Sequence, residues 1–170
     1  MKKFKIFITA TLLFLSCSAI FAQTATKVTK KDFQLFIGNW NGTLTYLDYS
    51  SNKPYTMPAD IEIRHLKKSN VFIFSNLYPD EPKANLSDSL TISENGKMIN
   101  KATVKSKRKL TNGNIKIVTE LMSIDGNDNK PATIRVTYTV GKNIYTNIKD
   151  VQFVGQNKWI KRHEYSYTRK

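Results

Sequence analysis

The sequence predicts an all-β protein, an up-and-down antiparallel β-barrel of about eight to ten strands with a short N-terminal helical plug. Short runs rich in β-branched and aromatic residues follow one another from Trp40 to Arg169, as they do in a chain of strands. Tight turn signals separate several runs, among them Asn95-Gly96 and Asn112-Gly113, which suit hairpins whose turn residues need positive φ. No stretch after Trp40 has a helical hydrophobic period.

The expected strands cover residues 40–49, 59–66, 71–77, 86–93, 98–110, 115–124, 132–140, 144–154 and 158–169. Short connections favour pairing between sequence neighbours, and a long meander has exposed edges unless the sheet closes. A barrel is the simplest closure. A β-sandwich is the alternative fold, and its crossing connection would be the proline-containing break at 78–83.

The helical plug is predicted from the spacing of Phe33, Phe36 and Ile37, which would share one face of a helical turn. A single turn is unstable in water, so it must dock on a larger apolar surface. Gly38 is expected to end the turn. The first strand then begins at Trp40.

The segment from Phe33 to Gly38-Asn39-Trp40 resembles the first motif of the lipocalins and the wider calycin group. This resemblance implies that a short helix closes the barrel floor, that Trp40 sits on it, and that a basic residue from the end of the barrel packs across the tryptophan. By position Arg169 is the candidate, with Arg162 second. The Gly38-x-Trp40-x-Gly42 start also resembles the haem-binding nitrobindin barrels, although Leu44 stands where their next glycine would be.

Closure of the barrel would place the last strand antiparallel to the first, and directly opposed residues share a face. Pairing Trp40 with Arg169 would oppose Gly42 to Tyr167, Leu44 to Tyr165, and Tyr46 to His163. Side chains with an aromatic body and a polar tip suit a cavity that is partly apolar and partly hydrogen-bonding. The predicted ligand-binding residues are Leu44, Tyr46, His65, Tyr138, His163 and Tyr165, and the predicted structural motif is Phe33, Phe36, Gly38, Trp40, Gly42 and Arg169.

The first residues predict export. Lys2, Lys3 and Lys5 precede an apolar run and a small-residue site at Ala22, which together are typical of a secretory signal peptide. We expect a signal peptide at 1–22, a flexible lead-in at 23–31 and one barrel domain at 32–170. Lipidation at Cys17 is the alternative to cleavage at Ala22. Cleavage would remove this single cysteine, which favours a periplasmic or extracellular bacterial protein without disulfides.

The charge balance allows several partners. The chain has 27 Lys and Arg against 13 Asp and Glu, so an anionic envelope surface is one expected partner, although such an excess also serves solubility. Lys101, Thr103, Lys105 and Lys107 alternate and are expected on an outer strand face. Export argues against nucleic acid as a partner, and the sequence predicts no transmembrane segment after signal cleavage.

The sequence gives little support for a catalytic, metal or cofactor site. No Gly-x-Ser-x-Gly or phosphate-binding loop is present, so a catalytic role is the less favoured reading. His65 and His163 do not form a zinc pattern, and the segment 125–129 fits a turn better than a calcium loop. No cofactor is predicted; haem with His163 as axial ligand is the alternative.

Two function classes follow. The first is an exported lipocalin-like protein that holds a small hydrophobic or amphipathic ligand in the barrel. The second is a cell-envelope interaction protein with a filled barrel and a basic outer surface. The residues by themselves do not choose the ligand.

Overall fold

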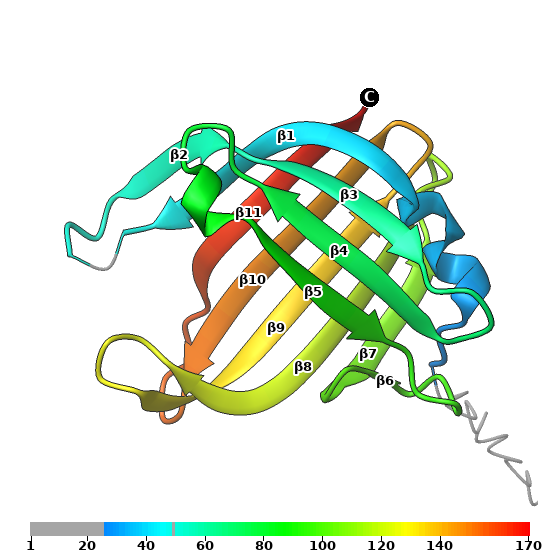
Figure 1. Ribbon diagram of the computed structural model, residues 1–170. Helices are drawn as coiled ribbons and strands as arrows, with labels where there is room; N and C mark the ends of the chain where they lie inside the picture. Colours follow the sequence, from blue (N-terminus) through cyan, green and yellow to red (C-terminus); the bar gives the residue numbers. More distant parts are fainter. Residues whose placement is uncertain (1–25, 49) are drawn as a thin grey trace, which may run out of the picture.

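The computed structural model describes residues 26–48 and 50–170. The predicted signal peptide, Cys17 and the start of the predicted lead-in lie outside the described residues. Within the described part of the chain, no helix is long and apolar enough to cross a membrane. The strands form one 11-stranded antiparallel sheet, which curls into a nearly closed barrel (Figure 1).

The strands are β1 (Gly38–Leu47), β2 (Pro54–Pro58), β3 (Asp60–His65), β4 (Val71–Leu77), β5 (Leu86–Thr91), β6 (Met98–Ile99), β7 (Ala102–Lys109), β8 (Ile115–Asp125), β9 (Lys130–Val140), β10 (Ile144–Phe153) and β11 (Ile160–Arg169). Two 3-10 helices, η1 (Lys30–Phe36) and η2 (Pro82–Ala84), complete the described elements.

Most strands pair with a neighbour in sequence, but β2 and β3 both pair with β1, and β11 returns to pair with β1 as well. The strand order is β5-β4-β3-β1-β11-β10-β9-β8-β7-β6, with β2 paired to β1 beside this path. The ends of the path, β5 and β6, are linked by a bridge between Ile92 and Ile99 and by the Asn100 N–H, which donates to the Thr91 carbonyl at 2.7 Å. The sheet is therefore an up-and-down barrel with one weakly joined seam.

The β1–β11 register is the one that the sequence predicted. Trp40 opposes Arg169, and the pairing continues through Gly42 with Tyr167 to Tyr46 with His163. A Cβ on Gly42 would lie 2.6 Å from Cδ1 of Tyr167, so only glycine lets this tyrosine pack against the strand.

Two strand predictions were incomplete. The structure adds β2, whose residues 55–58 the sequence left without a strand. The predicted strand 98–110 is broken at Asn100, which has φ 52°, into β6 and β7. A register shift between Val104 and Ser106 then breaks the alternation of β7, because a bulge adds one residue to one strand. Lys107 therefore turns to Asp32 of η1 at 3.0 Å instead of lining the outer face.

The predicted helical plug is not supported as such, because the segment forms only a 3-10 turn, η1. In a 3-10 helix, side chains three apart eclipse each other, so Phe33 and Phe36 point the same way and both are fully buried. Ile37 follows the helix as its C-cap in extended conformation. The described part of the predicted lead-in begins at residue 26. Within it, Val28 is buried, and its N–H donates to the Gly96 carbonyl oxygen at 2.9 Å.

The core lies at the η1 end of the barrel. Trp40 is 1% exposed, and its Nε1–H donates to the carbonyl of Phe36 at 2.8 Å. The guanidinium of Arg169 lies 4.0 Å from the centroid of the Trp40 ring. Its three nitrogens donate to the carbonyls of Leu35, Ile37 and Lys142 at 2.6–3.0 Å. This end of the barrel is closed, and we call it the floor.

Candidate functional site

Four tyrosines line the inner wall above the floor. Tyr145 and Tyr167 are neighbours on β10 and β11, and their rings stack at 5.1 Å with an interplanar angle of 18°. Tyr165 stacks on Tyr167 at 5.8 Å and 8°. Tyr138 reaches the same wall from β9, opposite Asn147. Alternation along the strands puts all four side chains on the inner face.

These tyrosines border an opening in the barrel interior that we call the lumen cavity, with a volume of about 270 Å³. Its walls combine apolar side chains, the tyrosines and a few amides. The lining residues are Ile61, Phe74, Asn76, Asp88, Ser89, Leu90, Asn100, Tyr138, Tyr145, Asn147, His163, Tyr165 and Tyr167. Asp88, Ser89 and Asn100 come from the two sides of the weak seam, so the cavity adjoins it.

Several polar groups of the cavity lack a protein partner. Tyr167 is only 3% exposed, yet no hydrogen bond joins its hydroxyl to another described residue. The Oδ1 of Asn147 is buried and unpartnered within the described residues. Tyr165 differs, because its hydroxyl meets that of Tyr78 at 2.8 Å. Buried polar groups are normally hydrogen-bonded, so unpartnered ones beside a cavity indicate a binding site.

The cavity is uncharged in its depth at neutral pH. Burial raises the pKa of Tyr138 to about 12, and burial likewise raises the pKa values of Tyr145, Tyr165 and Tyr167. Burial, reinforced by the Lys149 charge, lowers the pKa of His163 to about 4. The tyrosines therefore stay protonated and the imidazole stays neutral.

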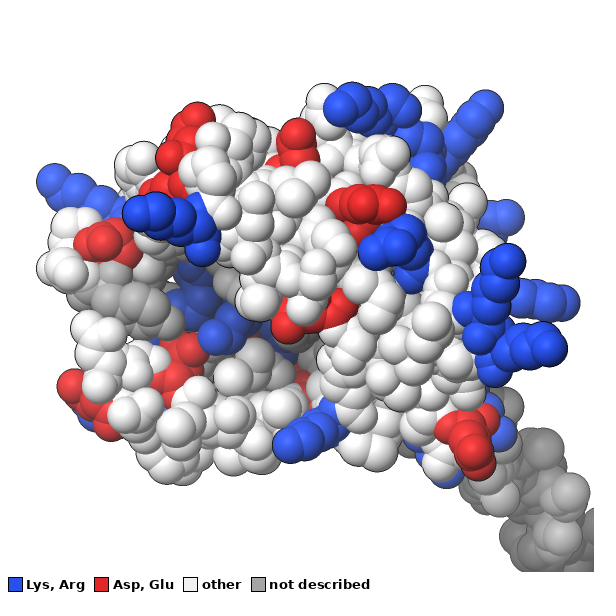
Figure 2. All heavy atoms as spheres, in the orientation of Figure 1, with Lys and Arg blue, Asp and Glu red and all other residues white. Residues whose placement is uncertain are grey.

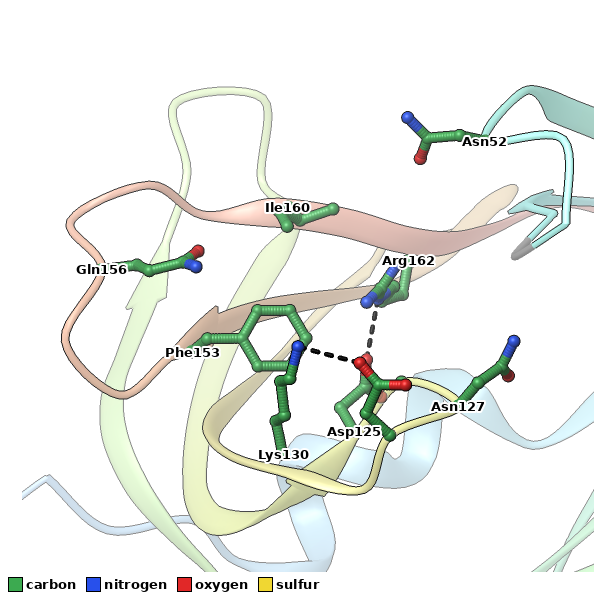
Figure 3. A pocket seen from close by; sticks show the side chains of 10 residues that line it. Asn52, Asp125, Asn127, Lys130, Phe153, Gln156, Ile160 and Arg162 are labelled. Carbon is green, nitrogen blue, oxygen red and sulfur yellow. Dashed lines mark hydrogen bonds and ion pairs between the residues drawn. The ribbon is translucent and has the colours of Figure 1, made fainter.

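A second pocket, the mouth pocket, lies at the end of β11 away from the floor and has a volume of about 400 Å³. Figure 3 shows the side chains of Arg162, Asp125, Lys130 and Phe153 around it. On the same side of the molecule, Figure 2 shows a hollow with Lys or Arg side chains in its depth. The pocket is lined by Asn52, Asp125, Gly126, Asn127, Asp128, Lys130, Phe153, Gln156, Ile160 and Arg162.

An ion triad occupies the inner side of the mouth pocket. The carboxylate of Asp125 accepts from Lys149 Nζ and from Arg162 Nε, each at 2.7 Å. The Asp125 side chain is 4% exposed. Burial acts to raise its pKa, but the hydrogen bonds and charges of the two cations hold that pKa below its usual value. The triad is a structural ion cluster whose charges compensate one another in part.

The structure brings together half of the predicted ligand-binding residues. Tyr138, His163 and Tyr165 line the lumen cavity. Leu44 and Tyr46 line a separate depression beside η2. His65 lies elsewhere: its Nε2 contacts the Ser69 carbonyl oxygen at 2.9 Å, and its ring packs 4.7 Å from that of Phe72.

Sequence reasoning missed most of the cavity lining, including Tyr145, Asn147 and Asp88. Tyr145 and Asn147 alternate with Ile144, Thr146 and Ile148 along β10, and this period was the available signal for an inward pair. Asp88 is inward because it opposes the buried Phe74. The ion triad left no local signal, since its members come from β8, β10 and β11.

Metal chemistry has no support in the described residues, where no group of three His, Cys, Asp or Glu side chains is placed to hold a metal ion. The described histidines are held apart, with His65 in the β3–β4 hairpin and His163 at the cavity. What the site offers is hydrogen bonding and apolar contact.

Comparison with known proteins identifies a fold and no family. No protein-family model matches the chain, and no curated protein matches it. A crystal structure of Rv2717c from M. tuberculosis is similar, with a TM-score of 0.52 and 9% identity over 82% of this chain and 96% of that one. A DUF3598 family protein of unknown function from Nostoc punctiforme PCC 73102 has a TM-score of 0.39 and 9% identity, covering 85% of this chain and 50% of that one. At this identity, the first likeness shows a shared barrel fold alone.

Proposed function

We propose that the protein is an exported, lipocalin-like binding protein that holds a small hydrophobic or amphipathic molecule in its barrel. The observation that carries this proposal is the lumen cavity with the Oδ1 of Asn147 on its wall, buried and without a partner among the described residues. A filled barrel would have packed or hydrogen-bonded such a group, because an unmade buried hydrogen bond costs about 1–3 kcal/mol.

The size and lining of the cavity fit a small ligand. Its volume of about 270 Å³ lies just below the roughly 300–1,000 Å³ of common ligand pockets. Ile61, Phe74 and Leu90 supply apolar contact, while the tyrosines, His163 and Asn147 supply hydrogen bonds. Small-molecule sites typically combine apolar walls with convergent polar groups, and in this cavity polar groups make up the larger part of the lining.

The lipocalin-like part of the proposal is supported by the floor. Arg169 of the last strand lies across Trp40 of the first, which is the arrangement that the resemblance implies. Gly38 permits the approach: its φ is 131°, and a Cβ there would lie 2.7 Å from an Arg169 nitrogen. The similarity to Rv2717c supports a barrel and adds nothing about function.

Haem is not part of the proposal. His163 does line the lumen cavity, as an axial ligand would have to. A tetrapyrrole is larger than the drug-sized molecules for which pockets of roughly 300–1,000 Å³ are typical, so it would need rearranged walls. The proposed ligand is smaller and needs no cofactor.

The alternative is a cell-envelope interaction protein that uses its basic surface. Lys101, Lys105, Arg108 and Lys109 are exposed on and beside β7, and such a row would attract anionic headgroups or polysaccharide. Lys105 is partly compensated by Glu120 at 3.7 Å. This surface could act together with the cavity or without it.

Native mass spectrometry of protein purified from its own host tests the proposal. We expect a retained small molecule in the wild type. Asn76→Phe should lose it, because Asn76 lines the cavity and a phenyl ring would fill the space. Ser75→Phe is the matched control, since Ser75 bonds Ser87 outside the cavity at 2.8 Å. Clean apoprotein from several preparations of folded wild type would favour the envelope alternative.

A further inference from the structure

The rim of the lumen cavity carries a solvent-exposed carboxylate, that of Asp88. Asp88 opposes Phe74 across the β4–β5 ladder, so both side chains share the inner face. No ion pair or hydrogen bond joins Asp88 to another described residue. Its charge reaches into the barrel, because it contributes to the raised pKa of Tyr165 on the far wall.

The depth of the cavity also offers an acceptor. The Oδ1 of Asn147, opposite Tyr138 and Tyr165 in the sheet, is buried without a partner among the described residues. An amide oxygen only accepts hydrogen bonds. The depth therefore presents a buried acceptor that needs a donor, and the exposed carboxylate at the rim adds a negative charge.

The aromatic wall presents ring edges to the cavity. The ring of Tyr167 stacks on that of Tyr145 and on that of Tyr165. The ring faces in these two contacts are therefore covered by neighbouring tyrosines. Polar edges and hydroxyls remain to meet a ligand. Hydrogen bonding, more than stacking, should then decide what binds.

Lys149 lies outside the cavity lining, but its charge acts on His163 at the wall, where it adds to the effect of burial on the pKa. Among the described residues that line the cavity, none is Lys or Arg. The nearest interior cations, Lys149 and Arg162, are bound to Asp125 at 2.7 Å. A carboxylate ligand could accept hydrogen bonds from the tyrosine hydroxyls, but its charge would face Asp88 with no lysine or arginine in the described lining to neutralise it, which is costly in a buried site.

We infer that the lumen cavity selects a small ligand that carries no negative charge and donates hydrogen bonds, with an organic amine preferred over a neutral alcohol and an anion rejected. This inference rests on the proposed function and narrows its ligand class. It runs against the net charge of +14, which by itself favours anions. The cavity volume corresponds to roughly nine water molecules at about 30 Å³ each, so the ligand has on the order of ten non-hydrogen atoms.

Three indole compounds of similar size test the inference: tryptamine as the cation, indole-3-ethanol as the neutral donor and indole-3-acetate as the anion. Affinities are measured at pH 7 by calorimetry or ligand-observed NMR. We expect the order tryptamine, indole-3-ethanol, indole-3-acetate. Asp88→Asn should weaken tryptamine about two- to fivefold, the effect of one rim charge, and leave indole-3-ethanol unchanged. Asp80→Asn, in the exposed β4–β5 loop, is the matched control and should change neither.

The outcomes separate the two proposals. Binding of indole-3-acetate at least as tight as that of the other two would overturn the inference while leaving a small-molecule cavity in place. If the Asp88→Asn variant prefers tryptamine as strongly as the wild type does, Asp88 does not set the preference, and the inference is overturned as well. If none of the three compounds binds folded protein and Asn76→Phe changes no retained mass, the proposed function itself fails.

Discussion

The floor and the lumen cavity lie on the same strands, but they differ in hydrogen bonding. Polar side chains have protein partners at the floor, whereas several lack them at the cavity. At the floor, Arg169 donates to three backbone carbonyls, and Trp40 Nε1–H also has its acceptor. Two residues before Arg169 on β11, the hydroxyl of Tyr167 has no described partner. Satisfied groups stabilise a fold, whereas unsatisfied groups beside a cavity are available to a ligand. The comparison places stabilising contacts at the floor and leaves the cavity end available for the binding that we propose.

Trp40→Ala should give the largest effect and would break the comparison most directly. It removes the largest fully buried side chain of the floor, and such changes cost about 3–5 kcal/mol. Chemical denaturation should show this loss, or the variant should fail to fold. A variant that melts within a degree or two of wild type would show that the floor is not the stabilising end.

Asp125→Asn should cost about 3 kcal/mol, because removing one partner leaves buried charge uncompensated. Lys149 and Arg162 would then lie close together without their carboxylate. Asp128→Asn, whose exposed partner is Lys130, is the control and should leave the denaturation midpoint unchanged. Equal effects of the two variants would show that the mouth triad is not a stabilising cluster.

Arg169→Ala should cost about 2 kcal/mol, since it removes charged hydrogen bonds and a cation over an aromatic ring. A double-mutant cycle with Trp40→Phe should show coupling between the two positions. Additive losses would mean that Arg169 acts through the carbonyls alone.

Acidification should lower the free energy of unfolding through His163, which lies at the cavity. Its pKa is about 4 in the folded protein and about 6.5 unfolded, so the unfolded chain takes up the proton first and stability falls as pH drops from about 6.5 towards 4. The expected loss between pH 7 and 5 is about 1–2 kcal/mol. The neighbouring groups are Lys149, Asp125 and Tyr165, and the lowered pKa of Asp125 places its own contribution at more acidic pH.

The variant His163→Gln isolates the contribution of His163, because a glutamine side chain does not titrate. Denaturation midpoints of the variant should be nearly flat between pH 7 and 5. If the variant follows the wild-type slope, other groups cause the acid sensitivity.

The smallest effect is expected for Tyr167→Phe, whose hydroxyl has no described partner. Its free energy of unfolding should change by less than about 0.5 kcal/mol. Tyr165→Phe loses the bond to Tyr78 and should cost about 1 kcal/mol. If Tyr167→Phe is the more destabilising variant, its hydroxyl is structurally satisfied and is not available to the proposed ligand.

The sequence by itself determined the meander and its closure. Tight turns and period-two runs favour pairing between sequence neighbours, and an open meander of this length is disfavoured by its edges. Closure then requires the last strand to meet the first, which is why the pairing of Trp40 with Arg169 was predictable. The inward positions of Tyr165, Tyr167 and His163 follow from that register.

Only the tertiary structure decided which side chains meet one another inside the barrel. The bulge in β7 turns Lys107 towards Asp32, and local alternation cannot reveal an added residue. Asp88 and Asn147 reach one cavity from β5 and β10, which are distant in sequence. A strand pattern tells which face a side chain takes, but the groups that it meets across a barrel depend on curvature and on the whole strand order.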